Sequence, residues 1–356
     1  MLVLTKTEQV EQKLRNMIAA GNYAHGAQLP TEKEMMRIFG VGKVTVRAAV
    51  DRLEADGLVR RRRGSGTYVN CPLGKSEIAI VGRMAAPNGM GNDFQTLVLS
   101  ELQGHIREAS FRPVLHFGSG TNSAEYRSSL KLFDPGVLYD AAGVIGLHDL
   151  REFDEELLDL GIPAVGISLV QATCRHCVVL DHAGMLDRMV DELQQRGIDE
   201  FAFVHFRFPD DYLTPGHQHQ ALARLYESLE HKANVTFVPI DYGDGMNPVH
   251  AYGILGRFLE MPNRPRCVVF ADDCIFALAF PAIFEHGLQV PRDIQIISHL
   301  NLGRAYGFPK PVTGIGFNPN RIADELWHML NDVMRAPGMP SSHVMIEPEW
   351  VRGETL

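Results

Sequence analysis

The first 70 residues place their apolar side chains with the period of short helices, followed by a short hairpin. Residues 7–20 show helical spacing of apolar positions. Thr31 and Glu34 form a capping-box pattern that predicts the start of a second helix, and residues 43–55 predict a third. Residues 58–69 predict a strand, a tight turn and a second strand. Three helices and a hairpin in this order predict a winged helix-turn-helix.

The pattern changes after a short linker at 71–76. Short apolar runs then alternate with longer stretches of helical period, which predicts parallel sheets joined by right-handed crossovers. The length of this part predicts two such sheets, so the expected fold class is α/β with an N-terminal winged helix-turn-helix. The predicted strands are 78–82, 114–117, 143–146, 202–205, 235–238, 268–271 and 294–297, and the predicted helices include 97–109, 185–196, 220–231 and 274–286.

Charge divides the chain at the same point as the periodicity. Residues 1–70 hold 12 Lys+Arg against 7 Asp+Glu, a balance of +5, which leaves -14 for the rest of a chain whose total is -9. A basic head on an acidic body predicts that the head binds nucleic acid, because the body would repel phosphate.

Several classes of protein are disfavoured by what the sequence lacks. The start of the chain has no apolar core of a secretory signal, and no run approaches 18 apolar residues, so a cytoplasmic protein is expected. Five cysteines in 356 residues do not suggest a disulfide framework. Cys174 and Cys177, with His176 and His182 nearby, leave a metal or redox site open, but ordinary core or loop positions are favoured, and no metal or other cofactor is expected.

The expected DNA-reading side chains lie at the start of the third helix. The first turns of the second helix of a helix-turn-helix enter the major groove, and here they carry Lys43, Val44, Thr45 and Arg47. Arg47 is the best candidate for bidentate contact with a guanine, and Val44 for contact with a thymine methyl. Lys33, on the preceding helix, is expected to contact the phosphate backbone.

Four consecutive arginines, 60–63, precede the predicted wing tip at Gly64. Successive strand residues point to opposite faces, so only a subset can face DNA, and one pair is expected to be solvated. An arginine beside a glycine-rich tip can enter the narrow minor groove. We therefore include Arg61, Arg62, Arg63 and Gly64 among the predicted DNA contacts.

The stretch LPTEKEMMRIFGVGKVTVRAAVDRLEADGLVRRRRGSGTYV resembles the winged-helix segment of the GntR family of bacterial regulators. The resemblance covers about 40 consecutive residues. It implies DNA contacts at Lys33, Lys43, Val44, Thr45, Arg47, Arg63 and Gly64. The sequence departs from the family at Lys33 and Lys43, where arginine is usual, and at Gly42, where a hydroxyl residue is usual, which puts the operator sequence in doubt.

The body is similar to the sugar-binding domain of LacI and GalR regulators, as found in arabinose-repressor-type members of the GntR family. The resemblance is carried, in order, by DHAGMLDRMVDELQQRGIDEFAFV, PRCVVFADDCIFALAFPAIFEHGLQVPRDIQIIS, KPVTGIGFNPNRIADELWHML and IEPEWVRGET. It implies a DNA-binding domain at 1–70 and a ligand-binding and dimerisation domain at 77–356. The implied lobes are about 77–178 with 302–330, and about 179–301 with 331–356.

The same resemblance implies ligand contacts where strand ends of the two lobes meet. Asp272 is the main candidate, with helix capping as its alternative role, and Phe94 is expected to stack on the ligand. Asp273 is expected to cap the following helix. His205 and Arg207 are weaker candidates just beyond a strand end.

Two departures make an ordinary monosaccharide a less certain ligand. The arginine that clamps sugar hydroxyls in many relatives is replaced by Ala221, and the aspartate that ends a later strand is replaced by Leu300. His217 and His219 lie just before Ala221, either as replacements for the clamp or, more simply, as surface residues.

The sequence therefore predicts a homodimeric transcription regulator, a repressor that binds a double-stranded DNA operator under control of a carbohydrate-like effector. The alternative is a DNA-binding protein that responds to no ligand and whose body only oligomerises. No catalytic residues are expected, because the sequence has no nucleophile elbow, no P-loop and no dinucleotide-binding glycine motif after a strand.

Overall fold

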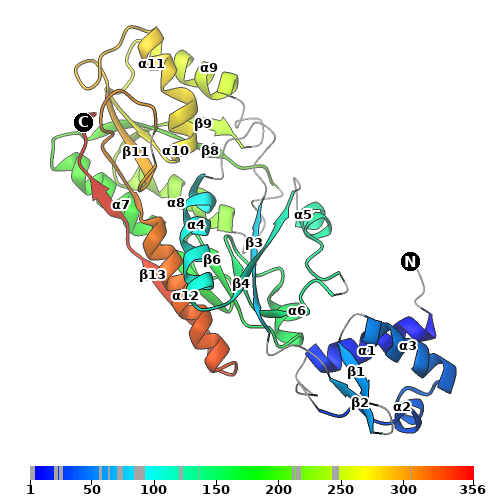
Figure 1. Cartoon of the computed structure of the whole chain (residues 1–356). Helices are drawn as coiled ribbons and strands as arrows, with labels where there is room; N and C mark the ends of the chain where they lie inside the picture. Colours follow the sequence, from blue (N-terminus) through cyan, green and yellow to red (C-terminus); the bar gives the residue numbers. More distant parts are fainter. Residues whose placement is uncertain are drawn as a thin grey trace.

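The computed structural model comprises a small N-terminal head and a larger two-sheet body (Figure 1). It describes residues 5–19, 23, 27–55, 58–62, 65–69, 75–83, 93–119, 123–134, 136–210, 213, 218–242, 248–304 and 306–356. The expected linker at 71–76 lies mostly outside these residues.

The head contains three helices and an antiparallel hairpin, as the sequence predicted. Its elements are α1 (Lys6–Ala19), α2 (Glu32–Phe39), α3 (Lys43–Ala55), β1 (Val59–Arg62) and β2 (Gly66–Val69). Thr31 accepts a hydrogen bond from the Glu34 backbone while the Glu34 side chain accepts from the Thr31 backbone, so the capping box is present. Gly40 ends α2 with φ 65°, a conformation that glycine adopts without strain.

One apolar core holds the head together. Leu14 of α1, Met35 of α2, and Val46 and Leu53 of α3 are all buried at 0–1% exposure. Because all three helices contribute to this core, the position of α3 relative to α2 is set by packing rather than by the turn alone.

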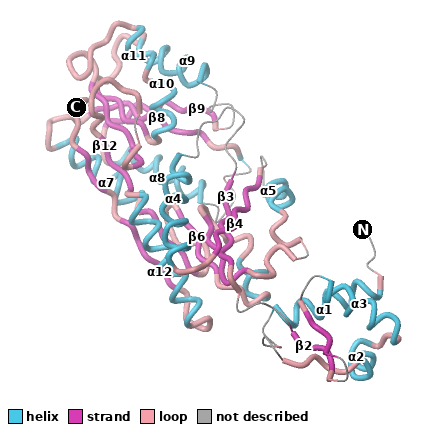
Figure 2. The backbone as a smooth tube through the Cα atoms, viewed as in Figure 1, coloured by secondary structure: helices cyan, strands magenta, loops and turns pink. Residues whose placement is uncertain are grey.

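The body holds two six-stranded sheets that are built almost wholly from parallel strands. Figure 2 shows the strands of the body in magenta, with helices beside them. The first sheet has the order β13-β7-β6-β5-β3-β4, and all its neighbouring strands are parallel. Its strands are β3 (Glu77–Arg83), β4 (Arg112–Gly118), β5 (Ala141–Gly146), β6 (Ala164–Ser168), β7 (His176–Leu180) and β13 (Ser342–Ile346). Its helices are α4 (Asp93–Glu108), α5 (Ser123–Leu130), α6 (Asp154–Asp159) and α12 (Pro319–Arg335).

The second sheet has the order β14-β12-β11-β10-β8-β9, with only β14 antiparallel to its neighbour. Its strands are β8 (Glu200–Arg207), β9 (Asn234–Asp241), β10 (Cys267–Phe270), β11 (Gln295–Asn301), β12 (Gly314–Phe317) and β14 (Glu349–Val351). Its helices are α7 (His182–Gln194), α8 (Gln218–Glu227), α9 (Pro248–Leu259), α10 (Asp273–Ala279) and α11 (Pro281–Glu285), with a 3-10 turn, η2 (Ser228–His231).

The final chain crossings between the sheets differ from the expected lobe boundaries. We expected 302–330 in the first lobe and 331–356 in the second, but β12 pairs with β11 in the second sheet and β13 pairs with β7 in the first. Gly314 and Gly316 of β12 lie against Leu300 of β11 so closely that any side chain there would clash. This close contact between the strands keeps β12 in the second sheet. The chain crosses to the first sheet only after β12.

The head lies at the end of the first sheet near α6 (Figure 1). Tyr139 of the body packs against the apolar core of the head. Gln12 and Arg15 of α1 line a cavity of about 240 Å³ together with body residues that include Leu132 and Leu138. A change in the first sheet therefore has a direct physical contact through which to act on α1.

In the described part of the chain, no helix has both the length and the apolar character needed to cross a membrane.

Replacing Thr31 by alanine should open α2 first. The variant loses the oxygen that accepts from Glu34 N, at a cost of about 1 kcal/mol, so hydrogen exchange of the first α2 amides in the full chain should quicken roughly fivefold. The reciprocal bonds, in which the Thr31 backbone and hydroxyl donate to the Glu34 carboxylate, lower the pKa of Glu34 below 4.5, so this second half of the capping box is fully present above pH 4.5 and is lost as the pH falls through the lower folded value. Equal exchange in both proteins would contradict the capping role.

Candidate nucleic-acid interface and ligand cleft

The start of α3 presents an exposed face that carries the predicted reading residues. Lys43 and Arg47 have 58% and 57% of their side chains exposed, and Val44 is 83% exposed. Thr45 is half-buried beside them. Val44 is therefore accessible for an apolar contact from this face.

Glu32 of α2 holds the two cations of this face. Its carboxylate is 2.7 Å from Arg47 Nε and 3.8 Å from Lys43 Nζ. Both pairs are exposed, so their net strength is small and DNA phosphate can compete for them. Lys33, also predicted to contact DNA, is exposed on the same helix as Glu32.

The wing arginines have different surroundings. The guanidinium of Arg61 donates to Glu54 at 2.9 Å and also contacts Asp51, so it ties the wing to α3. These two carboxylates raise the pKa of Arg61. Arg62 lies over the Tyr68 ring at 4.8 Å, on an exposed strand. The predicted contacts Arg63 and Gly64 lie outside the described residues.

A cleft lies where strand ends of the two body sheets face each other. It consists of two cavities of about 230 and 290 Å³ that share Phe94, Leu169, His219 and Tyr242. The first is lined mainly by second-sheet residues, among them Phe206, Phe208, Tyr226, Asp272, His299 and Asn301. The second is lined mainly by first-sheet residues, among them Arg83, Gln95, Tyr126, His148, Asp149 and Arg151.

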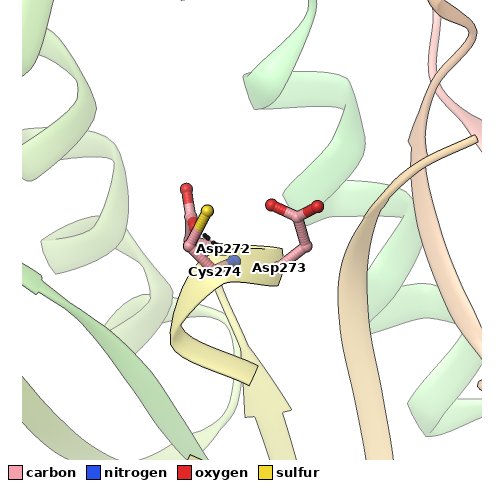
Figure 3. Close-up of side chains that lie close together, drawn as sticks. All are labelled: Asp272, Asp273 and Cys274. Atoms are coloured by element: carbon pink, nitrogen blue, oxygen red, sulfur yellow. Dashed lines mark hydrogen bonds between the residues drawn. The ribbon is translucent and has the colours of Figure 1, made fainter. Parts of the chain in front are cut away.

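Two adjacent carboxylates begin α10 at the wall of the first cavity (Figure 3). Asp272 caps the helix by accepting from Cys274 N at 2.8 Å. Burial and the neighbouring Asp273 raise the pKa of Asp272. Asp273 is not the cap that we expected, because its carboxylate accepts instead from Asn301 Nδ2 at 2.8 Å and Arg304 Nη1 at 2.7 Å.

Histidines form much of the remaining polar lining. His182 shares a hydrogen bond of 2.5 Å with the carbonyl of Leu169, and its ring stacks with that of His299 at 6.2 Å. Burial lowers the pKa of His182 to about 4 and that of His148 to about 4. Both rings are therefore neutral at pH 7. The two nitrogens of His148 are engaged by Tyr126 Oη and a backbone carbonyl, whereas the hydrogen bond of His182 to Leu169 involves Nδ1.

Unpaired polar atoms concentrate at the cleft. Within the described residues, eight buried side-chain nitrogen or oxygen atoms have no hydrogen-bond partner, and four of them belong to cleft residues: Gln95 Oε1, Gln218 Oε1, and Nδ1 and Nε2 of His299. Leaving such a group unpaired costs about 1–3 kcal/mol, so a ligand with hydrogen-bonding groups would gain by pairing them.

The structure brings two of the four predicted ligand residues to the cleft. Phe94 and Asp272 line it. His205 does not line either cavity, since its ring packs between Phe203 and Phe237. Arg207 does not line them either, and it pairs with Asp241 on an exposed strand end.

The structure also locates the residues at which the sequence departs from the sugar-clamp pattern. Ala221 lines a shallow depression outside the cleft, whereas His219 lines the cleft itself, and His217 lies outside the described residues. Leu300 is buried in β11, and its neighbours His299 and Asn301 point to the cleft. His299 and Asn301 were not predicted as cleft residues from the sequence. Their positions could have been inferred, because side chains alternate along a strand and the two neighbours of buried Leu300 lie on the opposite face.

Family models match both parts of the chain. Residues 6–69 match bacterial regulatory proteins of the gntR family, and residues 190–356 match a periplasmic binding protein-like domain. The chain joins a GntR-family DNA-binding domain to a periplasmic-binding-protein-like domain. The GntR domain thus coincides with the head, and the matched part of the second domain contains the whole β8 to β12 side of the cleft.

Curated relatives agree with this assignment. The chain is 24% identical over 306 residues to the arabinose metabolism transcriptional repressor of Geobacillus stearothermophilus, which covers 83% of this chain and 81% of that protein. It is 38% identical over 90 residues to the transcriptional repressor NanR of an Enterobacter species, but that match spans only 25% of this chain and 32% of the relative.

The fold of the body is that of LacI-type regulators. A lac repressor dimer solved on operator DNA with an anti-inducer matches with a TM-score of 0.60 at 13% identity, over 80% of this chain and 95% of that one. These relatives are transcription regulators and not enzymes, which agrees with the absence of catalytic motifs in the sequence.

The buried cleft histidines should make the body sensitive to acid. Because the folded pKa of His182 is near 4 and lies below the unfolded value of 6.5, unfolded chains bind a proton that folded chains do not, and stability falls as the pH drops from 6.5 to 4. Replacing His182 by phenylalanine should reduce the slope of stability against pH by up to about 1.4 kcal/mol per pH unit in this window. Chemical denaturation at several pH values measures it, and an unchanged slope would count against a neutral buried ring.

Proposed function

We propose that this protein is a transcriptional repressor whose affinity for operator DNA is controlled by a carbohydrate bound between the two sheets of its body. The observation that carries the proposal is the pairing, in one chain, of a GntR-type head with an exposed reading helix and a body cleft with four unpaired buried polar atoms. The first part supplies recognition of DNA, and the second supplies a place for an effector.

Sequence would be read by the start of α3. Arg47 projects from the exposed face and has a fork of donors that matches O6 and N7 of guanine. Val44 would contact a thymine methyl, and Lys43, Thr45 and Lys33 would contact phosphate or base edges. Glu32 holds Arg47 at one nitrogen only, so the remaining donors of that guanidinium can turn to DNA.

The wing would add contacts in the adjacent minor groove. Arg62 is exposed and lies over Tyr68, which leaves its charge accessible to phosphate. Arg63 and Gly64 stay proposed contacts by their place at the tip. Arg61 would act mainly by orienting the wing, because Asp51 and Glu54 both engage its guanidinium.

A carbohydrate fits the chemistry of the cleft. Sugar rings combine apolar faces with hydroxyl groups, and the cleft combines Phe94, Phe206 and Tyr242 with the carboxylate of Asp272 and the ring of His299. The relative that matches most of the chain is named for arabinose metabolism. The two neighbouring cavities, which share four lining residues, would offer room for a ligand that contacts both sheets.

Closure of the sheets on a ligand would act on the head through the contact at Tyr139 and α1. We further propose a homodimer, because one small winged helix makes few contacts and two heads can read two half-sites of an operator. The lac repressor with the same body fold was solved as a dimer on its operator.

Arg47→Ala should weaken binding to the preferred operator by about 1–3 kcal/mol, or roughly tenfold to a hundredfold, and should relax specificity. Gel shifts with the selected operator and a scrambled duplex measure both effects. The matched control is Arg52→Ala, which removes the same charge from the same helix at a side chain that faces Glu11 of α1. Equal losses in the two variants would show that α3 acts only as a positive surface.

Asp272→Asn should abolish most carbohydrate binding while keeping the fold. Asparagine also caps helices, so the bond to Cys274 N is retained, but the charged acceptor is lost at about 1.5–3 kcal/mol. Thermal shift against a library of sugars and sugar phosphates measures it.

The control for this substitution is Asp181→Asn, which alters the cap of α7 at a side chain that lines neither cavity and should bind as the wild type does. A wild-type protein that binds its operator but is stabilised by no compound in the library would instead support the ligand-independent alternative.

A further inference from the structure

Two cysteines lie together directly behind the wall of the cleft. Cys174 and Cys177 are 5% and 0% exposed, at the end of the β6–β7 connection and in β7. The chain bends so that Cys177 Sγ lies 3.6 Å from the carbonyl oxygen of Cys174, while Cys174 Sγ lies 3.6 Å from that of His176. The C-x-x-C of the sequence is thus folded into a single buried pair.

The two sulfur atoms do not have equal chemistry. The contact with the Cys174 thiol, together with the side chain of Ser168 and two backbone groups, lowers the pKa of Cys177, whereas the same contact and burial raise the pKa of Cys174. A thiol with a lowered pKa beside a second thiol is the arrangement from which a thiolate can form and exchange with its neighbour.

A metal site does not account for the pair. Among the described residues, the only group of three or more side chains placed to hold a metal is Asp272, Asp273 and Cys274. Burial, the charge on Arg175 and the nearby His343 lower the pKa of His176, and β7, which carries His176, pairs with β13, which carries His343.

The pair also contacts the segments that form the cleft wall. Any side-chain carbon at Gly166 would lie 3.2 Å from Cys174 Sγ and 3.0 Å from the carbonyl oxygen of His148, so the sulfur and the His148 segment meet across this glycine. Ser168 joins Thr173 by a hydrogen bond of 2.7 Å, and the next residue, Leu169, lines both cavities.

We propose that Cys174 and Cys177 form a redox-active dithiol that is oxidised to a disulfide by a hydroperoxide. The Cys177 thiolate attacks one peroxide oxygen, the O–O bond breaks, and protonation of the leaving group releases water, or an alcohol from an alkyl peroxide, with a sulfenic acid on Cys177. The sulfur of Cys174 then attacks that of Cys177, gives up its proton, and displaces water as the S–S bond forms. Overall, two thiols lose two hydrogen atoms, and the peroxide is reduced.

This site is independent of the proposed effector function, although its place behind Gly166 and His148 means that closing the disulfide changes the packing of the cleft wall. Because the pair is buried, only small oxidants reach it without local opening. Hydrogen peroxide is therefore the probe of choice.

The test treats the full-length protein with hydrogen peroxide, blocks free thiols, and maps disulfides by mass spectrometry under native conditions. The expected result is a peptide cross-linked between 174 and 177 that has lost two hydrogens and that recovers them with a reductant. Dimedone should trap a sulfenic acid at residue 177 in Cys174→Ser, because the resolving thiol is gone, and at neither position in Cys177→Ser.

Cys267 supplies the matched control, since it is also buried and its pKa is raised to about 12 by burial. Its alkylation and oxidation should be much slower than those of Cys177, and Cys267→Ser should leave the cross-link intact. Folded wild-type protein that forms no 174–177 cross-link, or that is labelled equally at 177 and 267, would overturn the proposal, and this reading does not depend on whether either serine variant folds.

Discussion

The structure depends on the common direction of its parallel strands. In each six-stranded sheet nearly all strands run the same way, so their carboxyl ends gather along one edge, and the two edges face each other across the cleft. Side chains far apart in the sequence, such as Phe94, His182 and Asp272, meet there for this reason alone. Four buried polar atoms of described residues at that edge have no hydrogen-bond partner, and a ligand could pair with them.

The head is governed by a separate balance of forces. Its core fixes α3 against α1 and α2, while its charges stay on the surface and pair only weakly, as at Glu32 and Arg47. Weak exposed pairs are suited to exchange with phosphate. Arg61 differs, because two carboxylates hold it and it braces the wing, so positive charges that are adjacent in sequence divide into structural and exposed ones.

Much of the fold could be predicted from local patterns. The capping box at Thr31 and the bounds of α3 follow from helix chemistry, and each of the seven predicted strands of the body overlaps an observed one. Five strands of the body were not predicted: β6, β7, β12, β13 and β14. The first three are short buried apolar runs, which resemble buried helix segments. The other two are short strands at the edges of their sheets, with few buried positions to mark them. The last crossings between the lobes were predicted at the wrong residues. The position of β12 depends on its close contact with β11 at two glycines, which the local pattern does not reveal.

The cleft was only partly predictable. Asp272 and Phe94 follow from strand ends and a family resemblance, but His182 and His299 become neighbours only through the meeting of β11 with the start of α7. His205 and Arg207 show that a position near a strand end is not enough to predict a ligand contact. The pleat turns His205 toward Phe237, and an ion pair with Asp241 holds Arg207 at the exposed end of its strand. Likewise the spacing of Cys174 and Cys177 does not reveal that their sulfur groups share one buried space.

The most direct test of the whole account is selection of bound DNA from a random duplex pool by the full-length protein, repeated in the presence of each carbohydrate that stabilises it. The account predicts one enriched sequence with two related half-sites, and a large change in its enrichment when the carbohydrate is added. Enrichment of no sequence, or of the same sequence to the same extent with every stabilising carbohydrate, would contradict it.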